Sequence, residues 1–198
     1  MSVCVVACSV LKGELRQLRA EGKLDAELVF VSKNFHVDYG QLESNLRRIL
    51  MRTKRRLGGR IVLIYGDLCL GQQGEMARLA REFGVVRVDA LNCIDCQLGG
   101  RGRALEIDPE QKLMFMGPGM IEFFSDMKRS LVQQGLDEAT FRGLFSGIRG
   151  IVLIDTLRDG GALLEGLEGL GLGLEVVETR AVGLDNFLRV VLDAVERC

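Results

Sequence analysis

The chain has 198 residues, a net charge of −1 and 27% charged residues, a composition that suits one globular domain. The nearly balanced charge gives no bulk attraction to nucleic acid or to a membrane surface. No apolar run approaches the roughly 20 residues of a membrane span, and the start MSVCVVACSV lacks the basic region of a secretory signal. We therefore expect a cytoplasmic protein, in which six cysteines favour metal or redox roles over structural disulfides.

Short apolar runs rich in β-branched residues recur along the whole chain. They are apolar throughout instead of alternating with polar residues, which is typical of strands in a parallel sheet covered on both faces. About seven strands are predicted, at residues 3–7, 28–31, 61–65, 85–88, 113–116, 151–154 and 174–177.

Segments with helical spacing of apolar residues alternate with these runs. After the first strand, Leu11, Leu15 and Leu18 recur at intervals that place them on one helix face. Further helices are predicted from about residue 41, over 76–83, from about residue 120, over 137–145 with Asp137 as the candidate N-cap, and over 184–196. The alternation predicts one α/β domain over residues 1–198, with a mostly parallel, doubly wound (Rossmann-like) sheet and helices on both faces.

Four cysteines lie just past the ends of predicted strands, namely Cys8, Cys69, Cys93 and Cys96. The only histidine, His36, also follows a predicted strand. Because the carboxyl ends of parallel strands form one rim of a sheet, residues far apart in sequence can meet there. Thiolates that meet at one point predict a soft-metal site.

Each of these residues also has a simpler interpretation. Free cysteine is commonly buried as a small apolar residue, and this interpretation suffices for Cys4 inside the first strand and for the terminal Cys198. A lone loop histidine such as His36 is more often hydrogen-bonded than catalytic, although its ordinary pKa suits proton transfer. An arginine- and lysine-rich stretch at residues 47–56 is most simply a solvated helix face, so we expect no nucleic-acid partner.

Cys93 and Cys96 form a CxxC motif, which a redox protein would place at the start of a helix. Gly99 and Gly100 follow within a few residues, so we expect a loop or a very short helix there. This favours half of a metal site over a redox pair. One CxxC supplies only two ligands, and Cys8 and Cys69 are the candidates to complete the set.

Two glycine-containing turns supply the other candidate residues. The segment 65–74 is a strand-to-helix loop in which Gly66 and Gly71 are candidates for binding a cofactor through exposed backbone N–H groups. It matches no nucleotide-binding motif. A second turn, at residues 117–119, precedes Glu122, which is either a proton-transfer group or a first-turn carboxylate favoured by the helix dipole.

Taken in order, these segments resemble a family of small bacterial and archaeal proteins known as a domain of unknown function. Its members carry Cys-Gly-x-Leu, Leu-His, Tyr-Gly-Leu-Cys-Gly, His-Asp-Cys-Ile and Leu-Thr-Pro-Gly-Trp-Ile-Glu segments. This chain offers Cys-Ser-Val-Leu at 8–11, Phe-His at 35–36, Tyr-Gly-Asp-Leu-Cys-Leu-Gly at 65–71, Asn-Cys-Ile at 92–94 and Met-Gly-Pro-Gly-Met-Ile-Glu at 116–122. The resemblance spans roughly residues 3–125 and implies roles for Cys8, His36, Cys69 and Cys93, but no reaction.

The chain departs from these motifs at three positions. Ser9 replaces a glycine, Tyr39 stands where a proline is expected, and Leu91 replaces the histidine before the third cysteine, while Cys96 is this chain's addition. Exchange of histidine for cysteine would keep a metal site and soften it.

We therefore expect a zinc or iron–sulfur site with Cys8, Cys69 and Cys93 as core ligands and Cys96 or His36 as the fourth. Such a site would activate a small-molecule substrate, with His36 and Glu122 as proton-transfer groups. Two alternatives remain. One is an accessory protein that delivers or senses a metallocofactor for a partner enzyme, and the other is a thiol redox protein that uses the CxxC pair. The metal and the oligomeric state are left open.

Overall fold

The computed structural model of the protein describes residues 3–198, which fold into two compact units. Unit 1 comprises Met1–Arg103 together with Leu184–Cys198, and unit 2 comprises Ala104–Gly183. The second unit is thus an insertion between two parts of the first. The short helix α5 (Arg103–Ile107) lies where the chain passes from unit 1 into unit 2.

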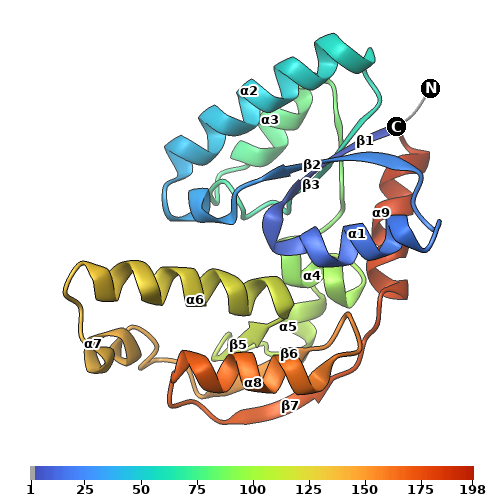
Figure 1. The fold of residues 1–198 in the computed structure, drawn as a ribbon. Coiled ribbons are helices and arrows are strands. Elements are labelled where there is room, and N and C mark those ends of the chain that lie inside the picture. Colours follow the sequence, from blue (N-terminus) through green and yellow to red (C-terminus); the bar gives the residue numbers. More distant parts are fainter. Residues whose placement is uncertain (1–2) are drawn as a thin grey trace. The chain divides into compact units, whose positions relative to one another are not determined.

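Unit 1 is built on a four-stranded parallel sheet with the order β2-β1-β3-β4 (Figure 1). Its strands are β1 (Val3–Cys8), β2 (Ala26–Val31), β3 (Ile61–Ile64) and the two-residue β4 (Val86–Arg87). Every residue of β1 and β3 is buried, which is the reason that these runs show no polar alternation.

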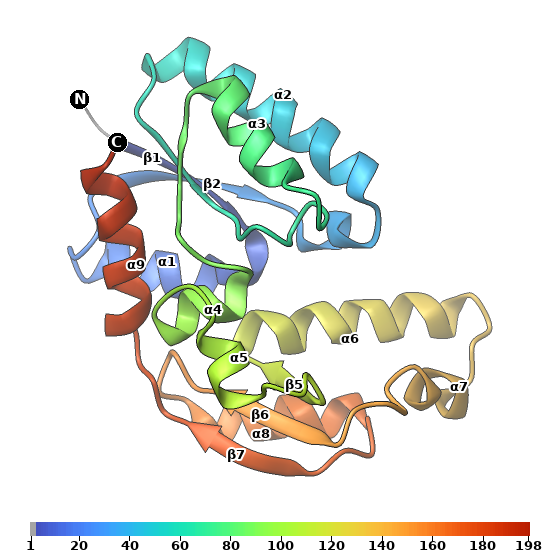
Figure 2. The same ribbon diagram turned by 180° about the vertical axis from the view of Figure 1, so that it is seen from behind.

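Helices cover both faces of this sheet, with α2 (Tyr39–Leu57) and α3 (Glu75–Phe83) on one face and α1 (Lys12–Ala20) and α9 (Asp185–Glu196) on the other (Figures 1 and 2). Each turns an apolar stripe inward, as Leu42, Leu46 and Leu50 of α2 illustrate. Three shorter helices lie in the connections: the 3-10 helices η1 (Ser9–Leu11) and η2 (Lys33–Val37), and α4 (Cys93–Leu98).

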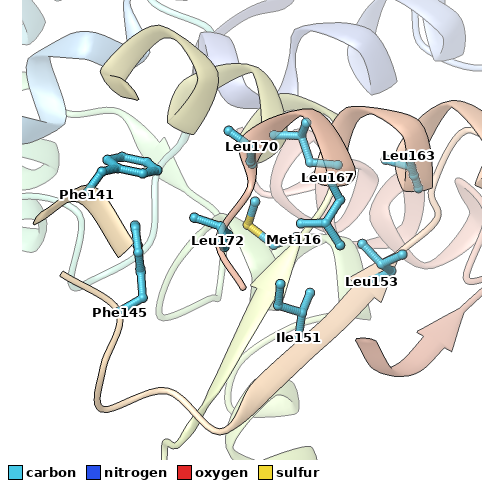
Figure 3. Packing of buried hydrophobic residues seen from close by; sticks show 10 residues of the cluster. Met116, Phe141, Phe145, Ile151, Leu153, Leu163, Leu167, Leu170 and Leu172 are labelled. Carbon is cyan, nitrogen blue, oxygen red and sulfur yellow. The ribbon is translucent and has the colours of Figure 1, made fainter. Parts of the chain in front are cut away.

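Unit 2 is a smaller α/β unit around the parallel sheet β5-β6-β7. Its elements are β5 (Leu113–Met116), α6 (Pro118–Gln133), α7 (Glu138–Gly143), β6 (Gly150–Ile154), α8 (Gly160–Leu170) and β7 (Val176–Arg180). Helices α6 and α8 pack together, and the sheet and α6–α8 enclose a buried apolar core (Figure 3). The side chain of Asp137 caps α7 by accepting a hydrogen bond from Thr140 N at 2.7 Å, as the sequence predicts.

The predicted fold class is confirmed: the described residues form seven strands, all pairing in parallel, alternating with helices. The strands are divided between two sheets instead of the single sheet expected. The first sheet ends at β4, which pairs with β3 at only two positions before the chain continues to α4. The last strand begins two residues later than predicted, at Val176. In residues 3–198, no helix is both long enough and apolar enough to cross a membrane.

Candidate functional site

Three strand ends in unit 1 lie at the same level of the sheet. In the register, Cys8 pairs with Val31 and Ala7 pairs with Ile64, so Cys8 and Tyr65 lie at the same rim. The chain places β2 on one side of β1 and β3 on the other, so the crossover helices α1 and α2 lie on opposite faces. Such a reversal of direction opens a crevice at the carboxyl ends of the two central strands, where α/β proteins bind ligands. Cys8 is the last residue of β1 and lies at this position.

Cys69 comes to the same rim on the loop that follows β3. This loop runs beside the segment that precedes α4: Asp67 N donates to Ala90 O at 3.0 Å, and Leu68 N donates to Leu91 O at 2.9 Å. The two backbones approach so closely that a Cβ on Gly66 would lie 2.3 Å from the Leu91 carbonyl. Glycine is therefore required at position 66 for packing, and the close approach brings Cys69 toward the CxxC segment.

Ion pairs also stabilise the loop that carries Cys69. The Asp67 carboxylate pairs with both Arg87 and Arg101, and Arg101 also pairs with Asp89 at 2.6 Å. Arg87 belongs to β4 and its side chain is only 17% exposed, so this part of the network is partly shielded from solvent. The network connects the Cys69 loop to the segments on both sides of α4.

The CxxC motif begins α4, a helix of six residues, in agreement with the expected loop or very short helix. Asn92 caps the helix by accepting a hydrogen bond from Asp95 N at 3.0 Å. The fully buried Asp95 carboxylate in turn accepts from Leu91 N at 3.0 Å and from Gly102 N at 2.8 Å. Asp95, one of the two residues between the cysteines, thus fixes the chain on both sides of the motif.

A buried hydrogen bond connects the CxxC helix to the helix that follows Cys8. Gln97, next to Cys96, donates from Nε2 to Oε1 of Glu14 in α1 at 2.6 Å, and both residues are fully buried. The residues are 83 positions apart in the chain. This contact fixes α1, which follows Cys8, relative to α4, which carries Cys96.

The four predicted thiols act on one another electrostatically. Burial raises the pKa of Cys8 to about 11 and that of Cys69 to about 12, and the charge of Cys8 contributes to the shift at Cys69. The pKa of Cys93 is raised well above its ordinary value by burial and then by Cys69, Cys8 and Cys96. Burial and the charge of Cys69 likewise raise the pKa of Cys96. We call these four cysteines, which lie within electrostatic range of one another in unit 1, the thiol cluster.

The thiol cluster has the donor chemistry of a soft-metal site, because zinc and iron–sulfur clusters are held by thiolates from several loops. All four cysteines are free. Within residues 3–198, no group of three or more His, Cys, Asp or Glu side chains is arranged so that it could hold a metal ion. The thiol cluster therefore fits a thiolate site in the chemistry of its donors and in its place at the rim of the sheet, but not in its present arrangement.

His36 and Tyr65 complete the surroundings of the thiol cluster. The His36 ring, on η2, stacks on the Tyr65 ring with centroids 6.0 Å apart and planes at 12°. Burial lowers the pKa of His36, which keeps the imidazole neutral near pH 7. The Nε2 of His36 and the hydroxyl of Tyr65 are both buried without a hydrogen-bond partner.

Gly71 and Glu122 are the two other residues that the sequence predicts for the site. A Cβ on Gly71 would lie 2.7 Å from the Glu75 carboxylate. This carboxylate accepts a hydrogen bond from Gln73 N at 2.8 Å, so a side chain of the same loop already binds one of its backbone N–H groups. Glu122 is an exposed residue of α6 in unit 2. The cofactor role of Gly66 and Gly71 and the proton-transfer role of Glu122 stay predictions.

The buried, unpaired hydroxyl of Tyr65 was not expected from the sequence, which places this residue at the end of a buried strand. The sequence does contain a signal for it, since a tyrosine with its polar hydroxyl ends a run that is otherwise wholly apolar. The Glu14–Gln97 contact was not expected either, and the sequence carries no signal for it because the partners belong to separate helices.

These features define an α/β protein with a buried thiol cluster at the topological switch point of its first sheet. Residues 30–187 match the family described as protein of unknown function (DUF1638), and the chain belongs to this family. The matched segment contains His36, Cys69, Cys93 and Cys96 and begins after Cys8. Searches of curated proteins and of solved structures found no match.

Proposed function

We propose that the protein binds a soft metal, as a zinc ion or an iron–sulfur cluster, through Cys8, Cys69, Cys93 and Cys96. The observation that carries this proposal is the presence of four free thiols, three of them buried and Cys93 partly buried, around the switch point between β1 and β3. A bound metal would supply Lewis-acid or redox chemistry to a small substrate or a partner enzyme in the cytoplasm. Cys96 is proposed as the fourth ligand because it and Cys69 both act electrostatically on Cys93.

The protonation state of the thiols supports metal binding over thiol redox chemistry. A redox cysteine needs a lowered pKa, because the thiolate is the nucleophile. Here burial opposes ionisation at all four positions, and neighbouring thiols add to this effect at Cys69, Cys93 and Cys96. A bound cation offsets both the cost of burying a thiolate and the repulsion between thiolates, because it neutralises the thiolates as their protons are released.

Titration of the reduced, metal-free protein with Co²⁺, followed by competition with Zn²⁺, tests the proposal. We expect one tightly bound ion per chain, with the charge-transfer absorption of cobalt–thiolate bonds. Alanine at Cys8, Cys69, Cys93 or Cys96 removes a direct ligand, so each should weaken binding by more than the roughly 10–100-fold typical of an outer-shell change.

Cys198→Ala is the matched control, because Cys198 lies at the chain end, outside the thiol cluster. It should bind cobalt as the unaltered protein does, and so should His36→Ala if Cys96 is the fourth ligand. Absorption spectra of anaerobically purified protein separate an iron–sulfur cluster from zinc. The proposal is wrong if neither metal is bound, or if Cys198→Ala weakens binding as much as Cys69→Ala.

A further inference from the structure

Tyr65 has a buried polar group with no partner. The residue is 1% exposed, directly follows β3, and lies beside the last residue of β1 in the parallel register. Buried hydroxyl groups are nearly always hydrogen-bonded, so an unpaired one indicates a missing partner. The hydroxyl is near the Cys8 thiol and interacts with it, yet the pair does not reach ordinary hydrogen-bond geometry.

We propose that the Tyr65 hydroxyl is a positioning group that donates a hydrogen bond to the Cys8 thiolate when the metal is bound. This inference rests on the proposed metal-binding function. In the protonated cluster, the Cys8 sulfur is a weak acceptor and the hydroxyl gains little from it. Ionisation by a metal turns the same sulfur into a charged acceptor, and hydrogen bonds to charged groups are roughly twice as strong.

The surroundings of Tyr65 limit which partner can reach its hydroxyl. The ring is held by the His36 ring stacked on it. Cys8 is the candidate partner because it lies beside Tyr65 in the β1–β3 register, in which Ala7 pairs with Ile64. Cys69 and Cys93 also act electrostatically on the hydroxyl. Hydrogen bonds to ligating atoms orient them and tune the metal, and their loss commonly weakens metal binding. The proposed role for Tyr65 is of this kind.

Tyr65→Phe removes only the hydroxyl, and the chain supplies a matched control. The one other tyrosine, Tyr39, is 54% exposed at the start of α2, so Tyr39→Phe makes the same chemical change away from the thiol cluster. We expect Tyr65→Phe to weaken Co²⁺ and Zn²⁺ binding by about tenfold or more. The cobalt–thiolate absorption should also move to longer wavelength, because a sulfur that loses a hydrogen bond donates charge more readily. Tyr39→Phe should change neither quantity.

Two further measurements separate this role from simple packing. Tyr65→Phe should leave the melting temperature of the metal-free protein equal or higher, since it deletes an unpaired buried hydroxyl, whereas a tyrosine needed for packing would lower it. In a Cys8→Ala background, Tyr65→Phe should have no additional effect on cobalt affinity.

The possible outcomes distinguish the two proposals. If the unaltered protein binds neither cobalt nor zinc and holds no iron–sulfur cluster, the proposed function fails and this inference fails with it. If the unaltered protein binds metal and Tyr65→Phe binds with the same affinity and spectrum, only the inference is overturned. The inference is also overturned if Tyr65→Phe lowers cobalt affinity in the Cys8→Ala background as much as in the unaltered protein, because the hydroxyl would then act through another group.

Discussion

At the scale of single residues, burial raises the pKa of every thiol of the cluster, and neighbouring thiols raise it further at Cys69, Cys93 and Cys96. Burial alone would leave a protonated, inert cysteine of the kind often found in protein cores. The influence of one thiol on another distinguishes these cysteines, which follow strand ends where the fold class ordinarily binds ligands. Cys4 is the useful contrast: it is fully buried inside β1, and its pKa is raised to about 11 by burial and by Glu27 instead of by other thiols.

The raised thiol pKa values predict that the metal-free protein loses stability in alkaline solution. Unfolded cysteines release their protons near pH 8.5. Folded Cys8 and Cys69 keep theirs until about pH 11 and about pH 12. Between these limits the folded state binds more protons than the unfolded state, so the free energy of unfolding falls as the pH rises. Urea unfolding of reduced protein at pH 8 and pH 10 should show this loss.

Cys8→Ala should make the pH dependence shallower, because it removes one of the groups responsible. Cys198→Ala, at the chain end, should leave it unchanged. Equal stability of the unaltered protein at pH 8 and pH 10 would contradict the proton linkage described above.

At the scale of elements, the site depends on two loops that contact each other through their backbones. The β3–α3 loop and the segment before α4 are joined by two backbone hydrogen bonds and by the ion pairs of Asp67. Gly66 lies where the two chains touch. The position of Cys69 relative to Cys93 is therefore set by backbone packing and does not depend on any metal.

Gly66→Ala should disrupt this contact, because its Cβ would lie 2.3 Å from backbone atoms that cannot rotate away. We expect a loss of about 3 kcal/mol in the free energy of unfolding, at the upper end of overpacking effects. Cobalt affinity should fall as well, since the two cysteine loops must separate. Chemical denaturation and metal titration measure the two effects.

Gly40→Ala is the control for this substitution. Gly40 lies in the first turn of α2, where a Cβ would meet only the exposed Asp38 carboxylate at 3.3 Å. Its effect on stability should stay within about 1 kcal/mol, the usual difference between glycine and alanine in a helix. If Gly66→Ala behaves like Gly40→Ala, the two loops are not in close contact.

At the scale of the whole molecule, each unit has its own sheet and its own buried residues. The thiol cluster belongs entirely to unit 1, whereas the core of Met116, Phe141, Leu153 and their neighbours belongs to unit 2. The parallel sheet of unit 2 and its helices α6 and α8 account for the burial of that core.

This division predicts that damage to the core of unit 2 leaves metal binding intact. Leu153→Ala removes a fully buried side chain from β6, so it should lower the stability of unit 2 by about 2–5 kcal/mol. Cobalt affinity, measured below the unfolding transition, should stay unchanged. Leu63→Ala makes the same change at a fully buried position of β3, beside the thiol cluster, and should reduce both stability and cobalt affinity. Loss of cobalt binding in folded Leu153→Ala protein would show that the site requires unit 2.

The sequence by itself determined the fold class, the positions of the strands and the residues most worth testing. Apolar runs, helical spacing and the cap at Asp137 depend on interactions within a few residues, so they can be read locally. The positions of Cys8, Cys69 and Cys93 after strand ends, together with the parallel rule, predict that they share one rim of the sheet, and a common site for them stays a prediction.

Only the tertiary structure decided which strands pair and which groups surround the thiols. The division into two sheets depends on where β4 stops pairing. The requirement for glycine at position 66 and the contact between Glu14 and Gln97 depend on segments far apart in the chain. The unpaired hydroxyl of Tyr65 is likewise a property of its burial among other elements, since only the assembled fold removes it from water.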